Sequence, residues 1–213
     1  MKIAILGTGD VGSNLATKIV ELGHEVRMGS RTPEKAKDWA KSHGNNASGG
    51  SFADAASFGE IVFNCTSGAA SLEALRLAGS ENLSGKTLID VSNPLDFSKG
   101  MPPTLIVSNT DSLGEQIQRE FPSAKVVKAL NMVGHDLHVN PGLVKGEHDL
   151  FICGNDDVAK GKATEILTRW FGWKSVIDLG GISASRGMEM YVPLWLTIAM
   201  RNNFAPFNIK IVK

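Results

Sequence analysis

A glycine-rich turn near the start of the chain has the residue types and spacing of a phosphate-binding loop. Residues 7–12 read Gly-Thr-Gly-Asp-Val-Gly and follow the apolar run of residues 3–6 directly. In such a motif Gly7 makes the tight turn, Gly9 lets the backbone approach a pyrophosphate, and Gly12 lets a helix pack on the strand. Free N–H groups and the dipole at the helix N-terminus then attract the anion. The candidate contacts from this motif are Gly7, Thr8, Gly9, Asp10, Val11 and Gly12.

The order of elements around this motif strengthens the prediction. A strand, the glycine turn, a helix and a second strand follow one another within about 30 residues, as dinucleotide-binding units require. A glycine-rich turn in some other α/β fold is the alternative. We predict dinucleotide binding.

The end of the second predicted strand indicates which dinucleotide is bound. Sites for NAD usually place a carboxylate there, which accepts a hydrogen bond from the ribose 2′-hydroxyl. This chain has Ser30, Arg31 and Thr32 instead, and its first carboxylate is Glu34. The Arg31 guanidinium can pair with a 2′-phosphate, the two hydroxyls can donate to it, and Lys35 could add charge. We therefore predict NADPH rather than NADH, although Arg31 could be a solvated surface cation and Lys35 fits an ordinary helix residue equally well.

Polar residues also follow three later strands, where ligands of parallel sheets bind. Thr66 and Ser67 begin a Thr-Ser-Gly segment, Asn93 lies in Ser-Asn-Pro, and Asn131 follows the strand that begins near residue 125. We expect Thr66, Ser67 and Asn93 to face the nicotinamide side, and we include Asn131 with them as a candidate contact. For each of them, a helix cap or a loop turn is the alternative.

No catalytic acid or base stands out. Tyr191 has no lysine four residues later, and the sequence has neither a Gly-x-Ser-x-Gly elbow nor a P-loop. His135 and His138 are interpreted as loop residues rather than metal ligands, because no cysteine or carboxylate cluster completes a site. Hydride transfer between two ring systems needs no side-chain acid or base at the carbon atoms, since positioning supplies most of the effect. We therefore name no catalytic residue and no metal ligand.

Composition excludes several classes of protein. The 213 residues carry 22 Lys plus Arg and 22 Asp plus Glu, so the formal net charge is zero and a basic nucleic-acid-binding face is not expected. Cys65 and Cys153 lie in apolar runs, which favours core thiols over a disulfide. There is no signal-peptide pattern and no apolar stretch long enough to span a bilayer. We expect a cytoplasmic protein.

Short β-rich runs alternate with helical patterns along the chain, which predicts an α/β fold. We expect a doubly wound, Rossmann-type, mostly parallel sheet with a short C-terminal helix-strand appendage. The predicted units are an NADP-binding domain over 1–180 and a packing or dimerisation segment over 181–213. Predicted strands are 3–6, 24–28, 60–65, 87–91, 125–130, 149–153, 175–179 and 208–212, and segment 44–50 is the most loop-like. Predicted helices start after the caps Thr32, Ser112 and Asn155, and a further helix spans 71–78, in addition to the helix that follows the glycine motif.

With these motifs in view, nearly the whole chain resembles the coenzyme F420-dependent NADP reductases, a family that also includes the soluble domains of some metalloreductases. The resemblance rests on residues 7–12, 29–31, 152–157, 180–186, 193–196, 200–203 and 208–211. It implies NADP binding by Gly7, Thr8, Gly9, Val11, Ser30 and Arg31, direct hydride transfer between nicotinamide and deazaflavin, and a compact protein that is often dimeric.

The sequence departs from that family on the hydride-accepting side. The family tends to have an apolar Ile-Pro-Trp-like segment where this chain has Thr66-Ser67-Gly68, and a histidine near Asn131. The acceptor is therefore open between a deazaflavin and a flavin. The alternatives are a reductase of a small imine or carbonyl compound, which usually has a longer C-terminal domain, and a non-catalytic NADP sensor. The C-terminal helix, with Tyr191 and Trp195, is interpreted as core packing that could extend to a homodimer interface.

Overall fold

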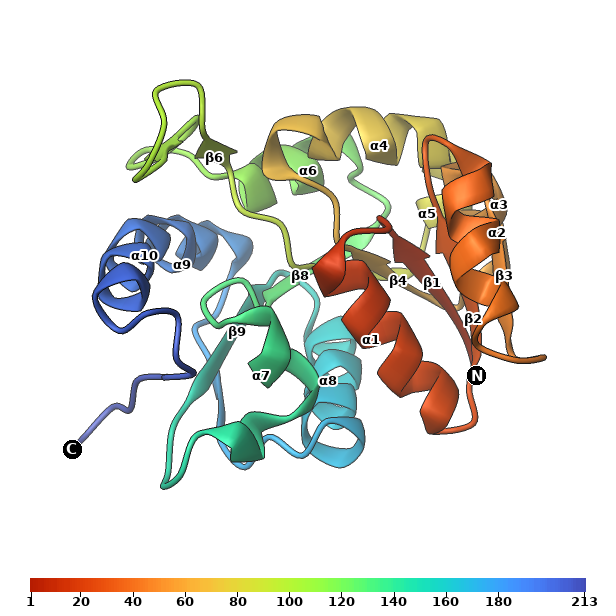
Figure 1. Cartoon of the computed structure of the whole chain (residues 1–213). Coiled ribbons are helices and arrows are strands. Elements are labelled where there is room, and N and C mark those ends of the chain that lie inside the picture. The colour runs from red at the N-terminus through yellow and green to blue at the C-terminus, as the bar shows by residue number, and fades with distance from the viewer.

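The computed structural model describes residues 1–213. The alternating strands and helices form one eight-stranded sheet with flanking helices (Figure 1). The strand order is β10-β9-β8-β5-β4-β1-β2-β3, and all neighbouring strands are parallel except β8 and β9. The strands are β1 (Lys2–Leu6), β2 (Glu25–Gly29), β3 (Ala47–Gly50), β4 (Ile61–Asn64), β5 (Thr87–Asp90), β8 (Lys125–Ala129), β9 (Leu150–Gly154) and β10 (Val176–Asp178).

Helices cover both faces of this sheet (Figure 1). One face carries α1 (Asp10–Glu21), α2 (Pro33–Lys41), α7 (His135–Val139) and α8 (Asp157–Glu165), which continues as a π-helical turn over Ile166–Trp170. The other face carries α3 (Phe52–Phe58), α4 (Ser71–Ala78), α5 (Ser80–Leu83), α6 (Leu113–Glu120) and α9 (Ser185–Met190). A small hairpin of β6 (Leu95–Asp96) and β7 (Thr104–Leu105) and the helix α10 (Val192–Arg201) complete the regular structure, with short 3-10 turns at Gly68–Ala70, Pro141–Leu143 and Ile182–Ala184.

The central strands are apolar throughout because both of their faces are buried. In β1, Ile3 and Ile5 point to the α1 side while Ala4 and Leu6 point to the α3 and α4 side, and all four are fully buried. The doubly wound, mostly parallel sheet that the sequence predicts is confirmed.

The strand order places a topological switch point between β1 and β4. From β1 the chain winds outward through β2 and β3, and from β4 it winds the opposite way through β5 and β8. The six parallel strands therefore have the 3-2-1-4-5-6 order of dinucleotide-binding sheets, in which ligands lie beyond the carboxyl ends of the strands at this point.

Four local predictions are wrong. Segment 44–50 is not all loop, since Ala47–Gly50 forms the edge strand β3, where small residues let α2 approach: a Cβ on Gly49 would lie 2.2 Å from the carbonyl carbon of Ala36. No strand forms at 208–212, and that segment instead bonds through Ile209 and Ile211 to Asp149.

The other two concern helix starts. His135 and His138 lie in the helix α7 rather than in a loop. Asp156, not Asn155, caps α8 by accepting a hydrogen bond from the Ala159 N–H at 2.8 Å, because Asn155 Oδ1 accepts from the Ile182 N–H instead. The predicted caps Thr32 and Ser112 do stand at the starts of α2 and α6.

Both cysteines are free thiols, as the sequence predicts. None of the helices has the length and apolar character needed to cross a membrane.

Candidate functional site

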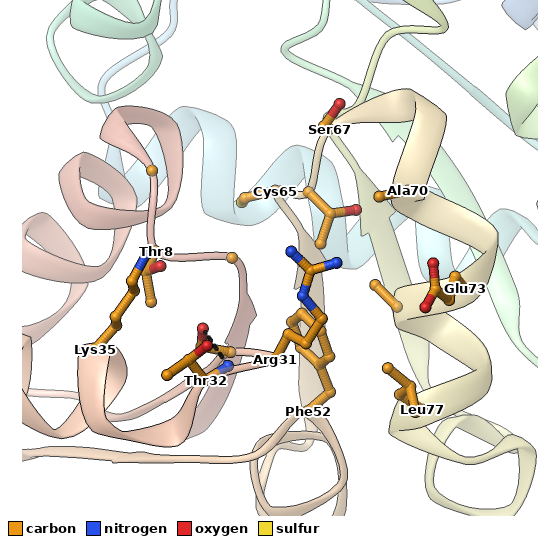
Figure 2. A pocket seen from close by; sticks show the side chains of 15 residues that line it. Thr8, Arg31, Thr32, Lys35, Phe52, Cys65, Ser67, Ala70, Glu73 and Leu77 are labelled. Atoms are coloured by element: carbon orange, nitrogen blue, oxygen red, sulfur yellow. Dashed lines mark hydrogen bonds between the residues drawn. The ribbon is translucent and has the colours of Figure 1, made fainter.

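A cavity of about 300 Å³ opens at the carboxyl ends of β1 and β2, beside the switch point (Figure 2). It collects residues from the glycine turn, from the end of β2 and from the segment after β4. The lining residues are Gly7, Thr8, Gly9, Ser30, Arg31, Thr32, Lys35, Phe52, Cys65, Thr66, Ser67, Ala70, Glu73, Ala74 and Leu77.

The glycine turn presents backbone donors to this cavity. Gly9 is the N-cap of α1 and no side chain caps the helix, so the first N–H groups of α1 have no intrahelical partner. A Cβ built on Gly9 would meet no atom within 4 Å and would stand in open space beside the cavity. A helix N-terminus that is uncapped and unobstructed is suited to an anion, and so the residues present fit a dinucleotide pyrophosphate.

The other two glycines hold the turn against the sheet. Gly7 has φ of +120°, and a Cβ there would lie 2.6 Å from the Cys65 carbonyl oxygen. A Cβ on Gly12 would lie 2.2 Å from the Gly7 carbonyl oxygen. Only glycine fits at these positions, which brings β1, the turn and α1 into close contact.

Two cations stand at the other end of the cavity without a carboxylate partner. Arg31 and Lys35 are both exposed, and neither side chain forms an ion pair or a hydrogen bond within the chain. In Figure 2 the Arg31 guanidinium points into the cavity, over Phe52 and toward the segment after β4. An unpaired guanidinium beside a hydroxyl-bearing turn is suited to a phosphate.

Hydroxyl groups flank the Arg31 side chain. Ser30 is buried, and its Oγ accepts a hydrogen bond from the Thr32 N–H at 3.2 Å, which fixes the turn after β2. Thr32 starts α2 but its side chain makes no capping hydrogen bond, so its hydroxyl remains available to the cavity.

A second cavity of about 300 Å³ adjoins the first and shares Cys65, Thr66 and Ser67 with it. It lies beyond β4 and β5 and has a mostly apolar wall with a few polar groups. Its other lining residues are Val11, Gly68, Val91, Ser92, Asn93, Leu95 and Phe97, and no basic side chain is among them.

The structure thus brings eleven of the fourteen predicted site residues to these two cavities, and three lie elsewhere. The side chain of Asp10 is exposed on the first turn of α1 and lines neither cavity, and Gly12 lies behind the turn. Asn131 is buried outside both cavities, where its amide donates to Asn93 Oδ1 at 3.0 Å and to the Met188 carbonyl at 3.2 Å. Asn131 therefore holds the Asn93 side chain in place and does not line a cavity itself.

Several lining residues were not predicted from the sequence. Phe52 starts α3, whose N-terminus is fixed by a capping box between Ser51 and Asp54, and that Ser-x-x-Asp spacing was a readable signal. Glu73 and Leu77, from α4, had no distinguishing pattern. Cys65 is also in the wall, where burial and the Asp90 charge raise the pKa of its thiol far above the usual range, so it is a neutral wall residue and not a nucleophile.

The histidines form no metal site. No group of three or more His, Cys, Asp or Glu side chains is arranged to hold a metal ion. Burial lowers the pKa of His138 to about 4, and its Nε2 lies 3.3 Å from the Val133 carbonyl oxygen.

The strand order, the crevice at the switch point and the uncapped glycine turn define a Rossmann-type dinucleotide-binding protein. Residues 2–94 match the family model described as NADP oxidoreductase, coenzyme F420-dependent. A crystal structure of a candidate F420-dependent NADP reductase from Arthrobacter sp. FB24 superposes with a TM-score of 0.95, at 48% identity, and covers 100% of both chains.

Two curated relatives agree with this match. The F420-dependent NADP reductase of Methanothermobacter marburgensis is 29% identical over 99% of this chain and 98% of its own length. Metalloreductase STEAP3 of Rattus norvegicus is 30% identical over 92% of this chain, but the chain spans only 37% of that relative. The chain belongs to the coenzyme F420-dependent NADP oxidoreductase family, and it is an NADP-dependent oxidoreductase.

Proposed function

We propose that the two adjoining cavities bind NADP(H) in an extended form and place its nicotinamide beside a flat redox ring. The glycine turn of residues 7–11 would hold the pyrophosphate. Ser30, Arg31, Thr32 and Lys35 would hold the adenosine 2′-phosphate, and Thr66, Ser67 and Asn93 would face the nicotinamide half. The observation that carries this assignment is the unpaired Arg31 guanidinium at the end of β2, where a carboxylate would select NADH.

The charge around the first cavity supports the phosphate assignment. Arg31 and Lys35 are its basic lining residues, and Glu73 is its one carboxylate. Figure 2 places Glu73 on the α4 wall, across the cavity from Lys35, so the cationic side lies next to the glycine turn. A phosphate bound there gains a charge-assisted bond with no ion pair to break first.

The lining of the second cavity supports an acceptor that is a flat, largely uncharged ring. Val11, Val91 and Phe97 supply apolar surface, while Asn93 and the hydroxyls of Thr66 and Ser67 supply a few polar contacts. When bound, the reduced nicotinamide supplies a hydride, which leaves NADP⁺ and a two-electron-reduced acceptor. The protein would contribute orientation and exclusion of water, since no titratable side chain of the wall is placed to move a proton.

We propose a deazaflavin or flavin as the acceptor. The experiment is oxidation of NADPH, followed by its absorbance, with coenzyme F420, FMN, ferric chelates and a cyclic imine in parallel. Turnover with F420 or FMN is expected. Turnover only with the imine would contradict the ring acceptor, and tight NADPH binding without turnover on any acceptor would indicate a sensor.

We further propose that two copies of the chain associate through the C-terminal segment of residues 181–213 and the β6–β7 hairpin, which project on the same side of the molecule (Figure 1). Apolar side chains of both are exposed, namely Phe97 (57%), Met101 (55%) and Ile106 (57%) around the hairpin and Leu194 (56%) on α10. Covering such a surface is favourable. Light scattering should give the mass of a dimer, and a monomeric mass would refute this association.

A further inference from the structure

Three charged side chains lie in the interior of the protein, behind the walls of the two cavities. Lys128 and Asp90 are fully buried, and Glu189 is 1% exposed. Lys128 comes from β8, Asp90 from β5 and Glu189 from α9, so the cluster joins the sheet to the C-terminal segment. Nothing in the proposed chemistry of the site uses these groups.

Each charge in this buried cluster is satisfied by short contacts. Lys128 Nζ lies 2.7 Å from Asp90 Oδ2 and 2.9 Å from Glu189 Oε1, and it donates to the Ser92 carbonyl at 2.6 Å. Glu189 also accepts from the N–H groups of Leu113 and Gly114, at 2.9 and 3.0 Å, where α6 begins. Burial alone would lower the pKa of Lys128, but the attraction of the two carboxylates outweighs it and the pKa is raised.

A chain of hydrogen bonds runs from this cluster to the first cavity wall. Asp90 Oδ1 accepts from Asn64 Nδ2 at 2.8 Å, and Asn64 Oδ1 accepts from the Thr66 hydroxyl at 2.7 Å. Asn64 is fully buried and also donates to Ser71 Oγ at 2.6 Å. The orientation of Thr66 in the cavity is therefore set by a residue that Asp90 holds.

A second chain runs from the cluster to the loop after β5. Asp90 Oδ1 accepts from Ser92 Oγ at 2.7 Å and from the Ser92 N–H at 3.2 Å, while Lys128 holds the Ser92 carbonyl. The next residue, Asn93, touches the other loop, since a Cβ on Gly68 would lie 1.9 Å from the Asn93 carbonyl oxygen. Both walls of the second cavity are thus tied to one pair of buried charges.

Stability alone is a poor reason for such a cluster. Removing charges from water costs several kcal/mol per ion, and apolar residues of similar volume are often equally or more stabilising. A cluster of paired charges does, however, fix directions as well as distances, because each hydrogen bond constrains the group at its other end.

We infer that Lys128 and Asp90 are positioning residues, which act through Asn64 and Ser92 to hold Thr66 and Asn93 in the orientation that receives the nicotinamide half of the cofactor. The inference rests on the proposed function, which assigns those loops to the nicotinamide. Glu189 couples the same loops to α9, so the C-terminal segment contributes to the site without lining it.

Two variants test this inference. Lys128→Met removes the central cation, and Asn64→Leu cuts the link to Thr66 while Lys128 stays paired with both carboxylates. Lys160→Met is the control, because Lys160 is a buried lysine paired with Asp178 at 2.8 Å on the β10 side and lines neither cavity. Calorimetric titration with adenosine 2′,5′-bisphosphate and with NADPH separates the two halves of the cofactor site.

We expect both variants to bind adenosine 2′,5′-bisphosphate within about two-fold of the wild type and NADPH about ten-fold more weakly, which corresponds to the loss of one or two oriented hydrogen bonds. The control should leave both affinities unchanged. Equal weakening of both ligands, or wild-type affinity for NADPH in Asn64→Leu, would overturn the inference, and Asn64→Leu decides the matter if Lys128→Met does not fold. If the wild-type protein instead binds NADPH no more tightly than adenosine 2′,5′-bisphosphate, the nicotinamide half contributes nothing to binding. That result would overturn the assignment of the loops to the nicotinamide.

Discussion

Gly12 lies directly against the Gly7 carbonyl group: a Cβ at residue 12 would stand 2.2 Å from the Gly7 oxygen. At residue 9, in contrast, a Cβ would meet nothing within 4 Å. The two glycines of this motif therefore have different roles. Gly12 allows α1 to pack closely against the turn at Gly7, and Gly9 leaves the surface beside the cavity open for a ligand.

This difference predicts opposite effects of substitution. Gly9→Val should lower NADPH affinity by about 100-fold or more through steric exclusion, and it should leave the unfolding temperature within about 2 °C of the wild type. Gly12→Ala should lower the unfolding temperature by about 4–10 °C, since overpacking costs about 1–3 kcal/mol. Thermal unfolding and calorimetric titration check both, and unchanged NADPH affinity in Gly9→Val would refute the placement of the pyrophosphate.

Arg31→Ala removes the cation assigned to the 2′-phosphate. We expect NADPH affinity to fall about 10- to 100-fold, as for the loss of a charge-assisted bond to a dianion, while NADH affinity changes less than about three-fold. Arg169→Ala is the matched control, because Arg169 is an exposed arginine paired with Glu165 and lines neither cavity. Equal losses for the two nucleotides would contradict the assignment.

His138 predicts a pH dependence of folding stability. Burial lowers the pKa of this histidine from 6.5 to about 4, while the neighbouring His135 lowers it further and Asp136 and the Val133 carbonyl raise it. Below about pH 6.5 the unfolded chain therefore binds a proton that the folded chain excludes. Its contribution to stability is present above pH 6.5 and is lost as the pH falls toward 4.

The corresponding experiment is denaturant unfolding of the wild type and His138→Leu at pH 7 and pH 5. Between pH 7 and pH 5, the free energy of unfolding should fall by about 2 kcal/mol less in the variant than in the wild type, because the variant lacks the histidine that takes up a proton on unfolding. Carboxylates that titrate in the same range contribute equally to both proteins. Identical losses in the two proteins would show that His138 is not buried as a neutral ring.

The sequence was most informative where a local pattern determines the structure. The spacing of residues 7–12, the missing carboxylate after β2 and the alternating runs predicted the fold, its glycine turn and the position of Arg31. These features depend on neighbouring residues alone. Helix caps were predicted less well, since Asp156 rather than Asn155 begins α8.

Features that depend on distant contacts could not be predicted. Asn131 looks like a site residue because it ends a strand, and only the packing of α9 shows that its amide is bonded to Met188. The strand at 47–50 is too small and glycine-rich to have a β pattern, and it forms because α2 packs closely over it. Asp90, Lys128 and Glu189 are separated by tens of residues, and their spacing has no motif that would bring them together.

The most direct test of the account is titration of the wild-type protein with NADPH and NADH at low ionic strength, where charge interactions are least screened. An unpaired Arg31 beside an open glycine turn predicts that both nucleotides bind and that NADPH binds at least about ten-fold more tightly. Equal affinities for the two nucleotides, or a preference for NADH, would contradict the assignment of Arg31 to the 2′-phosphate.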